Sequence, residues 1–165
     1  MLGLGRRDPL CAACWQGLER IRPPWCRCCG IAIGIEGLCG PCRRQRPRFA
    51  YARAAARYGG LVREAIHAFK FGGRRGMADP LGDLVAELGL SALPGATPDL
   101  LLPVPLHRRR ERERGYNQAL LLSRRLERAW GVPVAAEVLV RRGITAPQAD
   151  LDAPARRRNV RGPLP

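Results

Sequence analysis

The chain of 165 residues lacks any run close to the ~20 consecutive apolar residues that a membrane-spanning helix requires. Its first ten residues contain two arginines and a proline, and they lack the apolar centre of a secretory signal. The sequence therefore gives no indication of membrane insertion or of secretion. We expect a cytoplasmic protein whose cysteines stay reduced.

Lysine is almost absent as well. Arginine supplies nearly all of the 29 basic residues, which stand against 14 acidic ones for a net charge of +15, and Lys70 is the single lysine. An excess of arginine and alanine can reflect a GC-rich genome, in which case the charge carries no function. It can equally mean that the protein meets polyanions, either nucleic acid or phosphorylated small molecules.

Cysteine, in contrast, is abundant near the start, where three Cys-x-x-Cys pairs occur. Two such pairs supply the four thiolates of a tetrahedral structural Zn²⁺ site. In the second and third pairs, Gly30 and Gly40 permit the backbone angles of a tight metal-binding turn. We predict that Zn²⁺ is bound by Cys26, Cys29, Cys39 and Cys42.

The first pair, Cys11 and Cys14, has no fourth pair to join. It could be a redox pair, because this spacing also lowers thiol pKa, or half of a second zinc site, which we favour. Cys28 lies between predicted ligands, and we expect it to be a bystander. The cysteine-rich module has little apolar core, so its folding is expected to depend on its metal.

The remaining sequence alternates helix and strand patterns, which predicts an α/β fold. Gly72 is expected to end the first helix, Asp79 and Asn117 to cap the next two, and Gly131 to end the last. We divide the chain into a module over residues 1–48 and a domain over residues 49–165. Helices are expected at 61–71, 80–88 and 118–130, strands at 49–60, 100–104 and 132–141, and a loop at 144–165.

An arginine-rich segment from His107 to Gln118 follows the apolar run Leu100–Val104, which we expect to be a strand buried on both faces. Loops at the carboxyl ends of such strands are where α/β proteins bind ligands. Guanidinium groups and a helix N-terminus both suit phosphate oxygens. On charge alone, a solvated loop in which Glu111 and Glu113 pair with nearby arginines is the simpler interpretation.

A series of short motifs then runs along the chain in a fixed order. They are Cys26-x-x-Cys29-Gly30, Cys39-Gly40-x-Cys42, Pro47-x-Phe49, Tyr58-x-Gly60, Ile66-His67-x-x-Lys70-Phe71, Pro103–His107, Arg114–Gln118, Thr145-x-x-Gln148-x-x-Leu151 and Arg157-x-Asn159-Val160-x-Gly162. This order resembles the ComF family of competence-associated proteins and covers nearly the whole chain.

The resemblance implies an N-terminal zinc ribbon, a type I phosphoribosyltransferase-like domain and a role in DNA uptake during natural transformation. It implies phosphoribosyl pyrophosphate as the ligand, with Mg²⁺, and single-stranded DNA and the competence machinery as partners. Lys70 also has a second interpretation, in which its stem covers apolar surface. The substrate- or phosphate-binding residues implied are Lys70, Val104, Arg114, Gly115, Asn117 and Gln118.

The chain departs from the family pattern at both ends. The family has a further Cys-x-x-Cys pair ahead of Cys11, and a strand ending in two acids before a loop with paired threonines and a glycine. Here no two acidic residues are adjacent, and the two threonines, Thr97 and Thr145, lie far apart. We therefore expect a truncated phosphoribosyltransferase-like domain that does not catalyse phosphoribosyl transfer.

A second interpretation of function remains open, namely a non-enzymatic module that binds single-stranded nucleic acid through its zinc ribbon and arginines. A third is a remnant without function. The sequence indicates no nucleophile or general base. Of the two histidines, His107 is placed to touch phosphate, whereas His67 is expected to be a partly buried packing residue on its helix.

Overall fold

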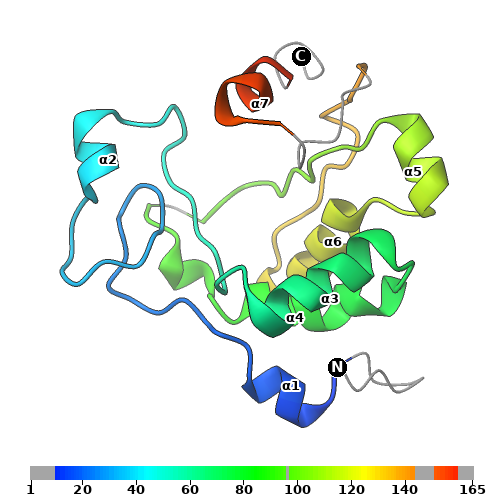
Figure 1. Ribbon diagram of the computed structural model, residues 1–165, viewed down its shortest axis with the longest axis horizontal. Coiled ribbons are helices and arrows are strands. Elements are labelled where there is room, and N and C mark those ends of the chain that lie inside the picture. Colours follow the sequence, from blue (N-terminus) through cyan, green and yellow to red (C-terminus); the bar gives the residue numbers. More distant parts are fainter. Residues whose placement is uncertain (1–9, 96, 144–150, 160–165) are drawn as a thin grey trace.

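The computed structural model describes residues 10–95, 97–143 and 151–159, and helices make up most of its regular structure (Figure 1). The short 3₁₀ helices η1 and η2 flank α4. The α-helices are α1 (Ala12–Gln16), α2 (Gly40–Arg44), α3 (Gly60–Phe71), α4 (Ala78–Ala86), α5 (Arg108–Arg114), α6 (Gln118–Trp130) and α7 (Ala153–Asn159), and the 3₁₀ helices are η1 (Arg75–Met77) and η2 (Leu90–Ala92).

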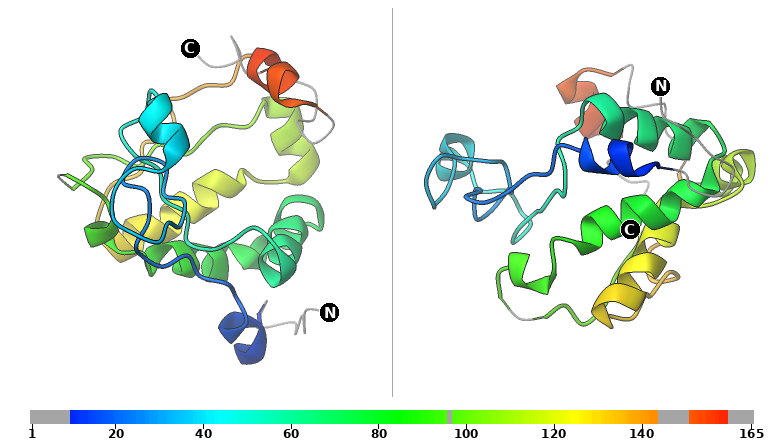
Figure 2. Two further views of the ribbon diagram at one scale, coloured as in Figure 1. Left: turned by 60° about the vertical axis from the view of Figure 1, so that its left-hand side comes forward. Right: turned by 90° about the horizontal axis from the view of Figure 1, so that it is seen from below.

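Helices α3, α4 and α6 lie side by side and contain the main core (Figures 1 and 2). The apolar residues of α3 recur at helical spacing, and this places Ala65 and Phe69 on its buried face. They meet Met77 and Leu81 at the start of α4, and Tyr116 closes the cluster. The helix at 61–71 is thus confirmed, with Gly72 at its end donating an N–H to the Ala68 carbonyl over 3.0 Å.

A glycine lets α4 and α6 approach closely. A Cβ built on Gly82 would lie 2.6 Å from Cγ and 2.7 Å from Cβ of Arg125 on α6. The same arginine forms an ion pair with Asp83, and Arg128 lies 3.4 Å from Asp79. The α4–α6 contact therefore combines a small residue at the crossing with charge pairs along its rim.

The cysteine-rich module extends away from this helical body (Figure 2). Arg53 connects the two: its Nε donates to the Ala92 carbonyl in η2 over 2.8 Å, and its Nη1 to the Arg27 carbonyl in the module over 3.3 Å. Its guanidinium carbon also lies 5.4 Å from the ring centroid of Trp25. One side chain thus fixes the module against the end of the α4–η2 segment. The division at residue 48 stays a prediction.

The predicted strands do not form in the described residues, where β pairing is limited to isolated bridges. Leu101 pairs in parallel with Val134, and Arg20 pairs with Ala56. The expectation that 100–104 is buried on both faces is wrong, since the side chains of Leu100 and Val104 are 49% and 60% exposed. A strand is buried on both faces when helices cover both sides of its sheet, and this segment forms one isolated bridge instead of a strand in a sheet.

The Leu101–Val134 bridge nevertheless has the direction that an α/β fold requires. Parallel neighbours must be joined by a crossover, and α5 and α6 lie between the two paired residues in the chain. One bridge is not a sheet, so the α/β class and the phosphoribosyltransferase-like fold stay predictions.

Three local expectations are corrected. Asp79 does not cap α4, because η1 runs directly into this helix and places Asp79 in its first turn. The arginine-rich segment is helical over α5, which His107 caps by accepting the Arg109 N–H at 3.2 Å. Residues 153–159 form α7 where we expected a loop, and Asp152 begins this helix by accepting the Ala155 N–H at 2.7 Å.

The tail motif falls partly on this helix. Arg157 and Asn159 belong to α7, whereas Thr145 and Gln148 lie outside the described residues. In the described part of the chain, no helix is both long enough and apolar enough to cross a membrane.

We predict that Gly82→Ala lowers the free energy of unfolding by about 1–3 kcal/mol, although alanine is the better helix former. The added methyl group meets the Cβ and Cγ of Arg125, which cannot move without displacing α6. Thermal or urea unfolding of the purified chain measures this. Gly76→Ala is the matched control, because a Cβ there meets nothing within 4 Å. Equal stability of the two variants would contradict the close α4–α6 contact.

Candidate metal centre and phosphate pocket

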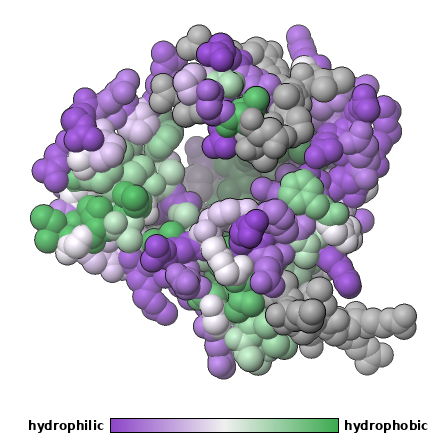
Figure 3. All heavy atoms as spheres, viewed as in Figure 1, coloured by the Kyte–Doolittle hydropathy of each residue, from purple (hydrophilic) through white to green (hydrophobic). Residues whose placement is uncertain are grey.

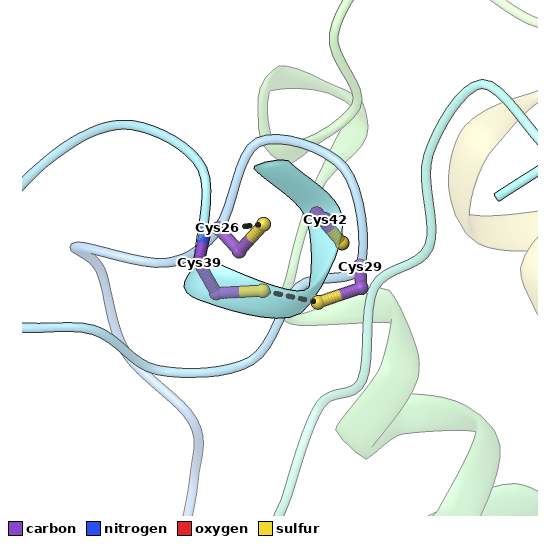
Figure 4. Close-up of side chains that lie close together, drawn as sticks. All are labelled: Cys26, Cys29, Cys39 and Cys42. Atoms are coloured by element: carbon purple, nitrogen blue, oxygen red, sulfur yellow. Dashed lines mark hydrogen bonds between the residues drawn. The ribbon is translucent and has the colours of Figure 1, made fainter. Parts of the chain in front are cut away.

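Four cysteines converge on one point in the N-terminal module (Figure 4). Cys26 and Cys29 come from a loop, Cys39 is the N-cap of α2, and Cys42 lies in its first turn. Their Sγ atoms all lie within 4.8 Å of one another, and the Sγ atoms of Cys29 and Cys39 are 3.6 Å apart. Tetrahedral zinc at ~2.3 Å from each sulfur needs sulfurs ~3.8 Å apart, so the donor set fits zinc. The predicted quartet is the one that the structure brings together.

The charge balance of this cluster also favours a cation. Burial opposes ionisation of Cys26, but the N–H groups of Cys39, Cys29 and Cys28 around its Sγ outweigh burial and lower the pKa of Cys26 to about 6. Burial raises the pKa of the Cys42 thiol, and the neighbouring cysteines raise it further. Once one thiolate forms, further ionisation needs a positive charge among the sulfurs, which a divalent ion supplies.

The other cysteines lie outside this quartet. Cys28 is buried and its carbonyl accepts the Ala52 N–H at 2.7 Å, which is a structural role. Cys11 is the exposed N-cap of α1, where its Sγ accepts the Cys14 N–H at 3.4 Å. That N–H group is the main cause that lowers the pKa of Cys11. Both proposed roles of the Cys11–Cys14 pair stay open.

The second candidate site depends on the turn between α5 and α6, residues 114–118, in which each residue has a distinct structural task. Gly115 adopts a left-handed conformation with φ of 84° and ends α5. The ring of Tyr116 stacks on that of Phe69 at a centroid distance of 5.5 Å, and its hydroxyl donates to the Phe69 carbonyl. This pair fixes the end of α5 beside the end of α3.

Asn117 fixes the start of α6. Its Oδ1 accepts the N–H groups of Ala119 and Leu120 at 2.9 and 3.4 Å, which confirms it as N-cap. Its Nδ2 donates to the Val104 carbonyl over 3.2 Å. Asn117 is buried, and these three hydrogen bonds join the segment after Leu101 to the helix that follows. Gln118 accepts a hydrogen bond from Arg114 and so orients that guanidinium.

The ends of α3 and α5 enclose a hollow of about 300 Å³. Burial lowers the pKa of Arg114, and the charge of Arg110 lowers it further. Glu113 is already paired with Arg109 and Arg110 at 3.0 and 3.1 Å. The hollow therefore has uncompensated positive charge of the kind that phosphate oxygens neutralise. Its lining residues are Lys70, Phe71, Gly73, Arg110, Glu113 and Arg114.

Of the predicted phosphate-binding residues, Lys70 and Arg114 line this hollow directly. Gln118 orients Arg114 by accepting its hydrogen bond. Gly115 ends α5, and Asn117 holds the segment at Val104 against the start of α6. Sequence reasoning missed Arg110 and Phe71. The pairing of Glu113 with nearby arginines, which the sequence suggested, is present, but on a helix instead of a loop.

His67 also differs from expectation, because it is exposed instead of partly buried. Its Nε2 lies 3.1 Å from the hydroxyl of Tyr58, and its ring centroid is 5.4 Å from that of Phe71. Phe71 in turn lies under the guanidinium of Arg114, 5.5 Å from its Cζ. An exposed row of rings therefore ends at the cationic hollow.

The structure thus brings together a cysteine quartet that fits a metal ion and a cationic hollow on a helical body. The chain is 31% identical over 158 residues to the DNA utilization protein YhgH of Salmonella typhi, covering 92% of this chain and 68% of that protein. It is 29% identical over 159 residues to competence protein F of Haemophilus influenzae, covering 94% and 69%. It is 30% identical over 130 residues to competence protein ComFC of Bacillus subtilis, covering 73% and 52%.

This chain belongs to the ComF family. It spans about half the length of the Bacillus relative and about two thirds of the other two. No protein-family model matches the chain, and no solved structure matches it.

We predict that Cys42→Ala abolishes stoichiometric zinc binding, because three thiolates leave the tetrahedral site incomplete. Zinc content after gel filtration, measured by atomic emission, checks this. Cys28→Ala is the matched control, since Cys28 is equally buried but lies outside the quartet, and it should retain the metal. Zinc loss in the Cys28 variant with retention in the Cys42 variant would refute the assignment.

Proposed function

We propose that this chain assists the handling of incoming single-stranded DNA during natural transformation, and that the hollow between α3 and α5 holds phosphate groups. The names of the relatives, competence proteins and DNA utilization proteins, support the biological setting. The main support for phosphate binding is that Lys70, Arg110 and Arg114 line one hollow. Glu113 offsets only part of their positive charge, so an anion that enters the hollow meets a net positive lining.

Structural zinc at the quartet would hold the N-terminal module in shape, because the buried residues of its own cluster are all cysteines. Arg53 would then transmit that shape to the helical body. The need for reduced thiols agrees with a cytoplasmic location, where we place the chain, and the competence machinery would supply its partners.

Phosphoribosyl pyrophosphate, the ligand that the family resemblance implies, would use the same cationic lining for its phosphates. Mg²⁺ fits less well, because Glu113 is the carboxylate of the described lining and is already paired with Arg109 and Arg110. For this hollow we propose the binding of phosphate groups, and no phosphoribosyl transfer.

The second candidate function is nucleic-acid binding by the cysteine-rich module itself. One observation favours it: the last turn of α2 carries the exposed residues Arg43 and Arg44, and the exposed Arg46 follows. These arginines are not among the residues that line the hollow between α3 and α5. The two candidates differ in which cations contact phosphate, and substitution can separate them.

We predict that the double variant Lys70→Gln and Arg114→Gln weakens binding of a single DNA strand at least about tenfold and lowers the slope of log K against log salt by about 1.4, since each phosphate contact contributes ~0.7. Fluorescence anisotropy of a labelled oligonucleotide over a salt series measures both quantities. Unfolding curves establish that the variant is folded.

The matched control removes the same charge from the cysteine-rich module, with Arg44→Gln and Arg46→Gln. It should leave the slope within about 0.3 of the unsubstituted chain. If the module variant loses the affinity and the hollow variant retains it, the hollow is not the phosphate site and the second candidate function is correct. Phosphoribosyl pyrophosphate added as competitor should displace DNA from the unsubstituted chain if both use the hollow.

A further inference from the structure

A row of three aromatic rings, here called the ring row, runs along the exposed side of α3: Tyr58 lies just before the helix, and His67 and Phe71 lie on it. Tyr58 and Phe71 are 64% and 63% exposed, and His67 is also exposed. Large apolar side chains that are exposed singly need no explanation, but a contiguous row beside a binding site does. The ring row is contiguous: Tyr58 contacts His67 at 3.1 Å, and the His67 and Phe71 centroids are 5.4 Å apart.

The row also leads directly into the cationic hollow. Phe71 lines that hollow together with Lys70, and the guanidinium of Arg114 lies over the Phe71 ring. Aromatic faces next to guanidinium groups are the combination that holds unpaired bases and their phosphates together.

The charges along α3 agree with such a ligand. His67 and Phe71 continue a stripe that begins four residues earlier at Arg63, and Lys70 lies beside them. The helix has one carboxylate, Glu64, against these basic residues. A negatively charged strand passing along the ring row would therefore meet net positive charge over its whole path.

A structural role alone explains the row less well. The Tyr58–His67 contact and the i, i+4 pair of His67 and Phe71 can support the helix. Neither contact requires the rings to remain mostly in water, and the buried face of α3 already holds the helix through Val62, Ala65 and Phe69. The exposed ring faces are what a ligand could use.

We propose that the ring row is a stacking platform for the bases of a single DNA strand whose phosphates lie in the hollow. This rests on the function proposed above, and it adds the feature that distinguishes a single strand from other polyanions. Bases in a duplex are already stacked and do not offer their faces. A row that continues away from the hollow over α3 suits a strand better than an isolated nucleotide, whose one base would cover one ring.

The test compares two strands of about 16 nucleotides, one of thymidylates and one of abasic sites with the same number of phosphates. The unsubstituted, zinc-loaded chain should bind the thymidylate strand about tenfold more tightly than the abasic strand. Tyr58→Leu and Phe71→Leu should each reduce that preference severalfold, because leucine keeps an apolar side chain but has no aromatic face. Phe71→Tyr should restore it.

Tyr58 lies at the far end of the row and is not in the lining of the hollow, so Tyr58→Leu should weaken binding of the thymidylate strand more than binding of the abasic strand. The matched control is Phe49→Leu, which removes another exposed phenylalanine outside the ring row and should keep the full preference. Unfolding curves for each variant separate loss of stacking from loss of structure.

The outcomes distinguish the two proposals. If neither strand binds, the proposed function fails. If both strands bind equally and only the Lys70 and Arg114 variant weakens them, the phosphate site stands and the stacking platform is wrong. Full preference in folded Tyr58→Leu and Phe71→Leu overturns the platform too. If free thymidine monophosphate displaces the strand at equal phosphate concentration, the ligand is a nucleotide and the proposal for a strand is overturned.

Discussion

The contact between Tyr116 and Phe69 is the constraint on which the arrangement of the helical body depends. It joins residues 47 positions apart in sequence, stacks two rings and satisfies the Phe69 carbonyl near the end of α3. It is the buried contact between the turn at 114–118 and the end of α3, whereas the contact of Arg114 with Phe71 lies at the surface. Because Lys70 and Phe71 follow Phe69 directly, and Arg114 precedes Tyr116 by two residues, this contact places both halves of the cationic hollow.

The molecule holds two clusters of ionisable groups, the cysteine quartet and the cationic hollow, and an ion of opposite charge would stabilise each of them. In the cysteine quartet, N–H groups favour one thiolate and burial opposes the rest, so the cluster favours a divalent cation. In the hollow, Arg110 and burial together lower the pKa of Arg114, so this cluster favours an anion. Arg53 connects the cysteine-rich module, which holds the quartet, to the helical body, which holds the hollow.

The surface differs between these two parts of the molecule. Hydrophilic side chains gather over α5, whereas the cysteine-rich module, which includes the exposed Ile31 and Ile35, presents hydrophobic surface (Figure 3).

Sequence reasoning succeeded where the signal is local. The Cys-x-x-Cys spacing identified the four cysteines that the structure brings together, because a tight turn brings both sulfurs of a pair to one side whatever surrounds it. Helical spacing located α3, and the Asn117 cap located the start of α6. It failed at residues 100–104, where an apolar run indicated a buried strand, because strand formation depends on a partner distant in sequence. It also missed α5, whose seven residues carry no apolar stripe and are held by charge pairs instead.

The sequence by itself indicated the cysteine quartet that fits zinc, the helices α3, α4 and α6, and the family, since each rests on residue types at fixed short spacing. Only the tertiary structure decided that Lys70 and Arg114 share one hollow, that Arg110 joins them, and that Tyr58, His67 and Phe71 form an exposed row. Composition shows that arginines are plentiful but not which of them face one another. That choice is made by the packing of Tyr116 on Phe69, a contact between distant residues that no local pattern encodes.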